Sequence, residues 1–187
     1  MRFIDDIATE LGFISPHFFA IPKKVGGSLM RVHRDVRFGK DKRPYKTNVG
    51  IQFRHERGKD VHAPGYYVHI EPGECFLGVG IWRPDAPSLG KIRDAIVEKP
   101  DKWKRAKTDK GFNKKYKMSG EALKNPPRGF DKEHPLIEDL KRKDFIAISN
   151  ISDKAVCAKD FKSRVVDSFQ EASTYMEFLC KALELRF

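Results

Sequence analysis

The alternation of hydrophobic and polar positions in the first half of the chain predicts an antiparallel sheet built from two hairpins. Residues 29–38 and 48–54 both alternate, and the turn "GKDKRPYK" separates them, which predicts a first hairpin. In residues 29–38 the apolar side also carries one basic residue, Arg34. The segments "YYVHIE" and "ECFLGVGIW" flank Pro72-Gly73 and predict a second hairpin.

Helical spacing appears at both ends of the chain. Apolar positions recur every three or four residues over 1–12, and the same pattern returns near the C-terminus. Between them, "RPDAPSLGKIRDAIVEKP" predicts a loop and a helix, "HPLIEDLKRK" a short helix and "DFIAISNI" a strand. The predicted fold class is therefore α+β: an antiparallel sheet of two hairpins plus a later strand, packed by N- and C-terminal helices.

A chain of 187 residues is expected to fold as a single domain, 1–187. We divide it into an N-terminal helix 1–12, a sheet core of about 29–83, a basic loop and helix region 84–134, and a C-terminal strand with helices 135–187. No apolar run is long enough to span a membrane. The three cysteines form no CxxC pair, so neither a zinc ribbon nor a disulfide framework is expected. This cysteine usage predicts a cytoplasmic location.

The positive charge is concentrated in two segments. Residues 31–46 hold seven basic and two acidic side chains, and residues 99–118 hold nine and two, so their net charges are +5 and +7. Since the whole chain carries +11, the remainder sums to −1. This distribution indicates an anionic partner. In 99–118 the aromatic residues Trp103, Phe112 and Tyr116 have two open interpretations: they stack on nucleic-acid bases, or they pin the segment onto the sheet.

The second hairpin carries an unusual strand face. Cys75, Leu77, Val79 and Ile81 share one face, which we expect in the core, while the other face reads Phe76, Gly78, Gly80 and Trp82. Glycine inside a strand usually marks a close approach by another group. Either a helix packs tightly there, which is the preferred interpretation, or the face is a shallow, aromatic-walled floor for a ligand.

The candidate site residues lie mainly in the first basic segment. Arginine and lysine bind phosphate and carboxylate groups, so the expected anion-binding residues are Arg31, Arg34, Arg37, Lys40, Lys42, Tyr45 and Lys46. Two pairs suit proton transfer, His33 with Asp35 and His69 with Glu71. Nucleotide-binding and metalloprotease motifs are missing from the sequence, and neither a metal nor a cofactor is expected.

Several of these residues also carry a family resemblance. The run "RDVRFGKDKRPYKT" at 34–47 resembles the signature of a bacterial and fungal family catalogued as domain of unknown function 2461, and the similarity continues at 64–67, 69–72, 78–82 and 125–147. Members typically carry a further N-terminal stretch, so the resemblance implies a shortened start. It implies no activity, but it gives 31–47 more weight than 99–118 as the site.

Three hypotheses follow from the sequence. In the leading one, the protein binds an anionic small molecule through 31–47, and whether it is an enzyme is left open. In the second, it binds nucleic acid through 31–46 and 99–118 together. In the third, the charges form an internal network with Asp35, Asp41, Glu71 and Glu74, and the protein is a structural scaffold.

Overall fold

The computed structural model describes residues 1–34, 36–37, 42–58 and 63–187. Its centre is a six-stranded sheet in the order β1-β2-β3-β4-β6-β5, in which every neighbouring pair is antiparallel. The strands are β1 (Phe18–Phe19), β2 (Val49–His55), β3 (Gly65–Ile70), β4 (Cys75–Ile81), β5 (Lys117–Ser119) and β6 (Phe145–Ile151). The fold is α+β, as predicted.

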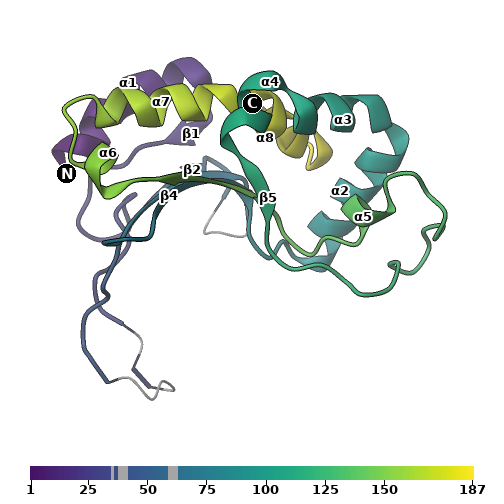
Figure 1. Ribbon diagram of the computed structural model, residues 1–187, viewed down its shortest axis with the longest axis horizontal. Coiled ribbons are helices and arrows are strands. Elements are labelled where there is room, and N and C mark those ends of the chain that lie inside the picture. Colours follow the sequence, from purple (N-terminus) through teal and green to yellow (C-terminus); the bar gives the residue numbers. More distant parts are fainter. Residues whose placement is uncertain (35, 38–41, 59–62) are drawn as a thin grey trace.

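Helices cover one face of this sheet. They are α1 (Arg2–Ile14), α2 (Ala86–Glu98), α3 (Pro100–Thr108), α4 (Lys110–Lys115), α5 (Ile137–Leu140), α6 (Asp153–Val156), α7 (Phe161–Glu171) and α8 (Ser173–Ala182). Helices α1, α7 and α8 lie over the curved sheet, whereas its opposite face is open (Figure 1). No helix in the described part of the chain is long and apolar enough to cross a membrane.

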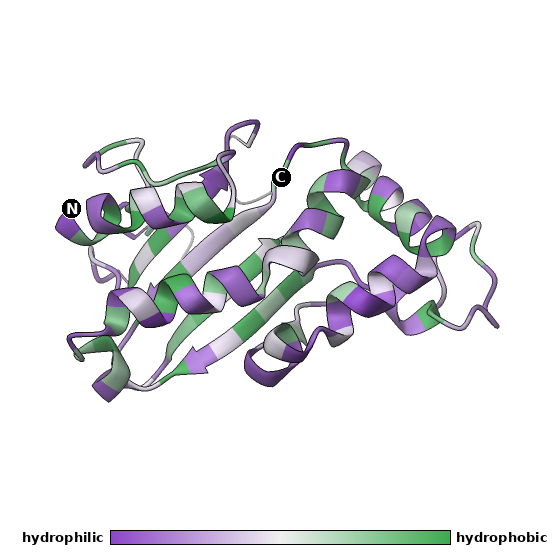
Figure 2. Ribbon diagram, turned by 90° about the horizontal axis from the view of Figure 1, so that it is seen from above, coloured by the Kyte–Doolittle hydropathy of each residue, from purple (hydrophilic) through white to green (hydrophobic). Residues whose placement is uncertain are grey.

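The core lies between the helices and the sheet. The view from the helical side shows hydrophobic positions along the strands beneath amphipathic helices (Figure 2). Leu77, Val79 and Ile81 of β4 are at most 2% exposed, and Leu11 of α1 and Phe169 of α7 pack in the same cluster. Burial of these apolar side chains is the main force that holds the helical layer on the sheet.

The second hairpin is confirmed. Strands β3 and β4 pair in register, with Val68 opposite Leu77, and the turn between them contains Gly73 at φ +83°. A left-handed backbone of this kind favours glycine. The Gly73 N–H donates to the Asp153 carboxylate at 2.9 Å and 3.1 Å, which ties the turn to α6.

The first hairpin is only partly as predicted. Residues 48–54 contribute to β2, but the described part of 29–38 forms no strand. Instead, isolated bridges join Leu29 to Ile51 and His33 to Tyr45. We call residues 30–34, 36–37 and 42–48 the arm; it projects from the sheet on the face opposite the helices (Figure 1). Alternation needs a second layer to bury its apolar side, and here Val32 remains 47% exposed.

The basic segment 99–118 is more regular than predicted, since it forms α3, α4 and the edge strand β5. Its three aromatic residues are buried: Trp103, Phe112 and Tyr116 are at most 2% exposed. Trp103 packs edge-on against Phe145, with ring centroids 5.8 Å apart. These aromatics therefore pin the segment to the core and are not available to stack on bases.

Candidate ligand-binding site

The open face of the sheet collects the side chains that point away from the helices. The pairing register places Gln52, Tyr67, Gly78 and Ile148 in one row across β2, β3, β4 and β6. The adjacent row contains Gly50, His69 and Phe76. Because alternate residues of a strand point to opposite faces, none of these side chains is needed by the helical core.

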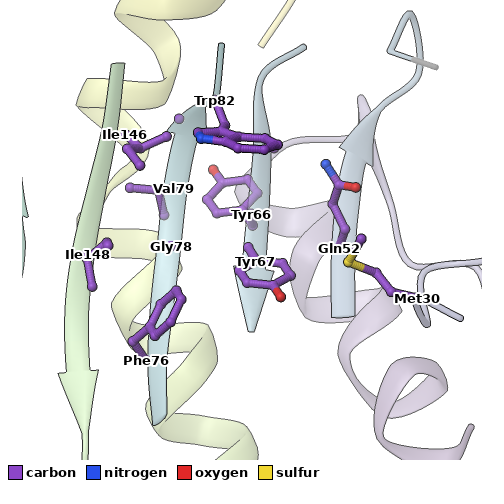
Figure 3. Close-up of a pocket in the computed structure, with 12 residues that line it drawn as sticks. Met30, Gln52, Tyr66, Tyr67, Phe76, Gly78, Val79, Trp82, Ile146 and Ile148 are labelled. Carbon is purple, nitrogen blue, oxygen red and sulfur yellow. The ribbon is translucent and has the colours of Figure 1, made fainter. Parts of the chain in front are cut away.

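A cavity of about 320 Å³ lies on this face, which we call the aromatic cavity. Figure 3 shows Tyr67, Phe76 and Trp82 around it, with Met30 and Gln52 at one side. Its full lining is Met30, Gln52, Gly65, Tyr66, Tyr67, Phe76, Gly78, Val79, Gly80, Trp82, Ile146 and Ile148. No helix in the described part of the chain contributes to it, so the preferred interpretation of a tightly packed helix is wrong.

Positions 78 and 80 of β4 are glycine for different structural reasons. A Cβ at Gly78 would lie 3.5 Å from Tyr67 Cβ, an ordinary van der Waals distance, so this glycine leaves space in the cavity floor. Gly80 has φ +113°, and a Cβ there would lie 2.0 Å from the Phe145 carbonyl oxygen. Gly80 is therefore required by the neighbouring backbone of β6, whereas Gly78 is not.

Trp82 is held at the rim of the cavity by a buried carboxylate. Arg83 adopts φ +48°, which is uncommon for a residue with a side chain, and its guanidinium carbon lies 4.8 Å from the centre of the Trp82 ring. Asp144, only 2% exposed, accepts hydrogen bonds from the Arg83 N–H at 2.7 Å and the Glu121 N–H at 2.8 Å. This charge-assisted clamp stabilises the backbone that places the indole.

One end of the aromatic cavity leads into a polar network centred on His69. Its Nε2 lies 3.2 Å from Glu71 Oε2, and its Nδ1 lies 3.2 Å from the Tyr67 hydroxyl and 3.4 Å from Asn48 Nδ2. The imidazole stacks on Phe76, with ring centroids 4.5 Å apart. The predicted pair His69 and Glu71 is therefore brought together, next to a cavity.

The ionisation of this network follows from its contacts. Thr47 Oγ1 donates to Glu71 Oε1 at 2.5 Å; this hydrogen bond and the one from His69 hold the pKa of Glu71 below its ordinary value. Burial raises the pKa of Tyr67, so its hydroxyl stays protonated. Because Glu71 is a carboxylate, it accepts the hydrogen of His69 Nε2, and in the neutral form of His69 Nδ1 is then an acceptor.

A second cavity, of about 310 Å³, adjoins the network and is lined by Arg34, Lys46, Thr47 and Asn48. We call it the basic cavity. Thr47 and Asn48 also bond to Glu71 and His69, while Tyr67 and Phe76 both line the aromatic cavity and contact His69. The aromatic cavity, the His69 network and the basic cavity are thus linked by shared residues. The prediction that Arg34 would point toward an apolar side is wrong, since Arg34 lines the basic cavity.

The other predicted site residues lie farther out on the arm. Lys42 donates to the Val36 carbonyl at 2.8 Å, and Tyr45 packs its ring against His33 at 5.2 Å. Arg31, Arg37, Lys42 and Tyr45 are exposed and line neither cavity. Asp35, Lys40 and Asp41 lie outside the described residues, so the pairing of His33 with Asp35 stays a prediction.

The sequence interpretation missed several residues of this site, among them Asn48, Gln52 and Met30. Positions 48 and 52 share the face of Gly50, two residues apart along β2 and its approach, which is the signal that could have identified them. Met30 reaches the cavity because its N–H donates to the Gly50 carbonyl at 2.9 Å. Among the described residues, no group of three or more His, Cys, Asp or Glu could hold a metal ion.

Comparison with known proteins gives one match. The family model described as "Conserved hypothetical protein (DUF2461)" matches residues 1–178, which include the arm, every strand of the sheet and most of the helical layer. No curated protein and no solved structure matches the chain. Because the family match covers nearly the whole sequence, the protein belongs to the DUF2461 family.

Proposed function

We propose that the protein binds a small organic anion, a carboxylate or phosphate carried on an apolar body, on the open face of its sheet. The observation that carries this proposal is the linkage of an apolar cavity to a basic one through Tyr67, Phe76, Thr47 and Asn48. Such a site recognises a molecule by two chemically different ends, and neither end alone satisfies it.

The apolar body fits the aromatic cavity. Its walls are aromatic and aliphatic, and Gly78 leaves its floor without a side chain. A phenyl-sized group that buries roughly 100 Å² there would contribute about 2.5 kcal/mol to binding. Edge or face contacts with Tyr67 and Phe76 favour a flat group over a globular one.

The anionic group fits the basic cavity. Arg34 supplies a planar guanidinium, Lys46 an ammonium group, and Thr47 and Asn48 neutral polar groups. A charge-assisted hydrogen bond contributes about 1.5–3 kcal/mol where water is partly excluded. Since both cations come from the arm, the arm supplies the charge and the sheet supplies the apolar surface.

The structure favours this proposal over the nucleic-acid hypothesis. The aromatic residues of 99–118 are buried, and α3 and α4 lie on the helical side of the sheet, away from the arm (Figure 1). Lys107 and Lys115 pair with Asp139 and Glu171 at 2.7 Å and 2.8 Å. The described parts of the two basic segments therefore do not form one continuous strip of cations and aromatics, as a single-strand binding surface would.

The proposal is tested by isothermal titration calorimetry with three compounds: phenylpropionate, its uncharged analogue phenylpropanol, and acetate. We expect phenylpropionate to bind at least about tenfold more tightly than either of the others, because only it occupies both cavities. Lys46→Gln should remove most of that advantage. The control Lys114→Gln, an exposed lysine of α4, should keep it.

Two results would overturn the proposal. Equal affinities for phenylpropionate and phenylpropanol would show that no anion is recognised. Binding that weakens equally in Lys46→Gln and in Lys114→Gln, and that collapses with added salt for all anions, would favour diffuse attraction and the nucleic-acid hypothesis.

A further inference from the structure

We propose that Tyr67, His69 and Glu71 form a proton relay that gives this site acid–base capability, with Tyr67 as the residue that contacts the bound molecule. This inference rests on the proposed function, because the relay needs a molecule in the aromatic cavity. His69 and Glu71 act through Tyr67 and are positioning residues.

The relay is a continuous chain of hydrogen bonds. Thr47 fixes one oxygen of Glu71, and the other accepts from His69 Nε2 at 3.2 Å. His69 Nδ1 then faces the Tyr67 hydroxyl at 3.2 Å, and Tyr67 lines the aromatic cavity. A carboxylate that orients an imidazole, which in turn faces a hydroxyl at a cavity, is the arrangement of an activated hydroxyl group.

The chain has two protonation states, and each presents a different group to the cavity. With neutral His69, Tyr67 donates its O–H to Nδ1, and its oxygen is an acceptor toward the cavity. A bound molecule can then give a proton to the Tyr67 oxygen while the original Tyr67 proton passes to Nδ1. The molecule keeps the electron pair of the broken bond, and Glu71 stabilises the imidazolium that forms.

In the reverse direction, protonated His69 donates from Nδ1 to the Tyr67 oxygen. The Tyr67 O–H must then turn away from His69, and it becomes a donor toward the bound molecule. Burial raises the pKa of Tyr67, which disfavours a free phenolate and favours proton transfer through the hydroxyl over storage of charge on it. The same side chain is thus an acceptor or a donor according to the state of His69.

The two states of the relay predict how ligand binding affects the proton of His69. His69 contacts the Glu71 carboxylate, the Tyr67 hydroxyl, the Asn48 amide and the Phe76 ring. A bound anion is stabilised by a hydrogen-bond donor, and Tyr67 presents one to the cavity only in the state in which His69 Nδ1 carries a proton. Binding should therefore be accompanied by proton uptake at His69, and affinity should rise as the pH falls.

The chain contains a matched control for this relay. His17 Nδ1 lies 3.0 Å from Glu56 Oε1, and this pair has similar side-chain exposure to His69 and Glu71: 19% and 36%, against 14% and 28%. His17 does not line either of the two linked cavities. His17→Gln therefore removes a histidine with a carboxylate partner without affecting the relay.

The test is calorimetric titration of phenylpropanesulfonate, whose acid group stays ionised, in buffers of different ionisation enthalpy near pH 6.5. We expect net proton uptake on binding in the unmodified protein and in His17→Gln, and none in His69→Gln. Tyr67→Phe should weaken binding about fivefold to tenfold at pH near 6 and far less at pH near 8, because only the O–H donor is lost.

The outcomes separate the two proposals. Binding without proton uptake, or uptake that persists in His69→Gln, would overturn the relay and leave the anion site standing. A Tyr67→Phe variant with the same pH dependence as the unmodified protein would exclude Tyr67 as the contact residue. Absence of phenylpropanesulfonate binding at every pH would overturn the proposed function itself.

Discussion

The two glycines of β4 offer the sharpest separation of a binding role from a structural one. We expect Gly78→Ala to keep or increase stability while it impairs binding, and Gly80→Ala to destabilise the fold. Both residues lie in the same strand, two positions apart, and both face away from the helices. The same chemical change, one methyl group, is therefore placed in two different surroundings.

The magnitudes follow from what each new methyl group would meet. At Gly78 the nearest side-chain atoms are at 3.5–3.9 Å, so the methyl fits, and the loss of glycine flexibility in the unfolded chain stabilises the protein by about 0.4–1 kcal/mol. At Gly80 the backbone is left-handed, and the Phe145 oxygen is only 2.0 Å away. Strain and the displaced β6 should cost about 2–4 kcal/mol.

For ligand affinity, unlike for stability, the informative change is Gly78→Ala. The methyl of Gly78→Ala occupies the floor of the aromatic cavity, and overpacking against a bound ring costs about 1–3 kcal/mol, a loss of roughly fivefold to 150-fold in affinity. Urea unfolding measures the first quantity, and calorimetry with phenylpropionate measures the second. A folded Gly78→Ala protein with unchanged affinity would refute the assignment of this cavity as the site.

Three further predictions concern other parts of the molecule. Burial lowers the pKa of His55 below 6.5, so the folded protein favours the neutral imidazole. The free energy of unfolding should therefore keep the full His55 contribution above pH 6.5 and lose it as the pH falls below that value. His55→Gln should flatten this decline in urea titrations at several pH values. Asp144→Ala should lower the free energy of unfolding by about 2–4 kcal/mol and expose Trp82 further to iodide quenching, whereas unchanged quenching would exclude the clamp. Trp103→Ala should cost about 3–5 kcal/mol in the same unfolding assay; a small loss would contradict its role in anchoring the basic segment.

The second hairpin could be predicted because local signals agreed. Alternation identified both faces of β4, Pro72-Gly73 identified the turn, and the structure buries Leu77, Val79 and Ile81 together. Each of these signals is set by neighbours close in the sequence, where strand period and turn chemistry are sufficient.

The arm shows where local pattern fails. Residues 29–38 alternate in sequence as β2 does, yet no helical layer covers the part of this segment that the structure describes, and alternation cannot report whether a second layer exists. The prediction that Arg34 lies on the apolar side of this segment failed for the same reason. Its position at the basic cavity depends on how the arm leaves the sheet, which no feature of the segment itself specifies.

The charge pattern identified the two basic segments but not where they lie in the fold. Residues 31–46 and 99–118 are both strongly basic in the sequence, but burial of Trp103 and Phe112 attaches the second segment to the helical layer. Among the predicted anion-binding residues that the structure describes, only Arg34 and Lys46 line the basic cavity, and the others lie farther out on the arm. The pair His69 and Glu71 was found because both residues alternate on one strand face and its adjoining turn.

The central claim is that one small molecule uses the aromatic cavity and the basic cavity together. The most direct measurement is chemical-shift mapping of the isotopically labelled protein during titration with phenylpropionate. We predict that the backbone amides of Tyr67 and Gly78 on the sheet and of Thr47 and Asn48 at the base of the arm shift along one common saturation curve. Shifts confined to α3 and α4, or shifts in the sheet without any at Thr47 and Asn48, would contradict the account.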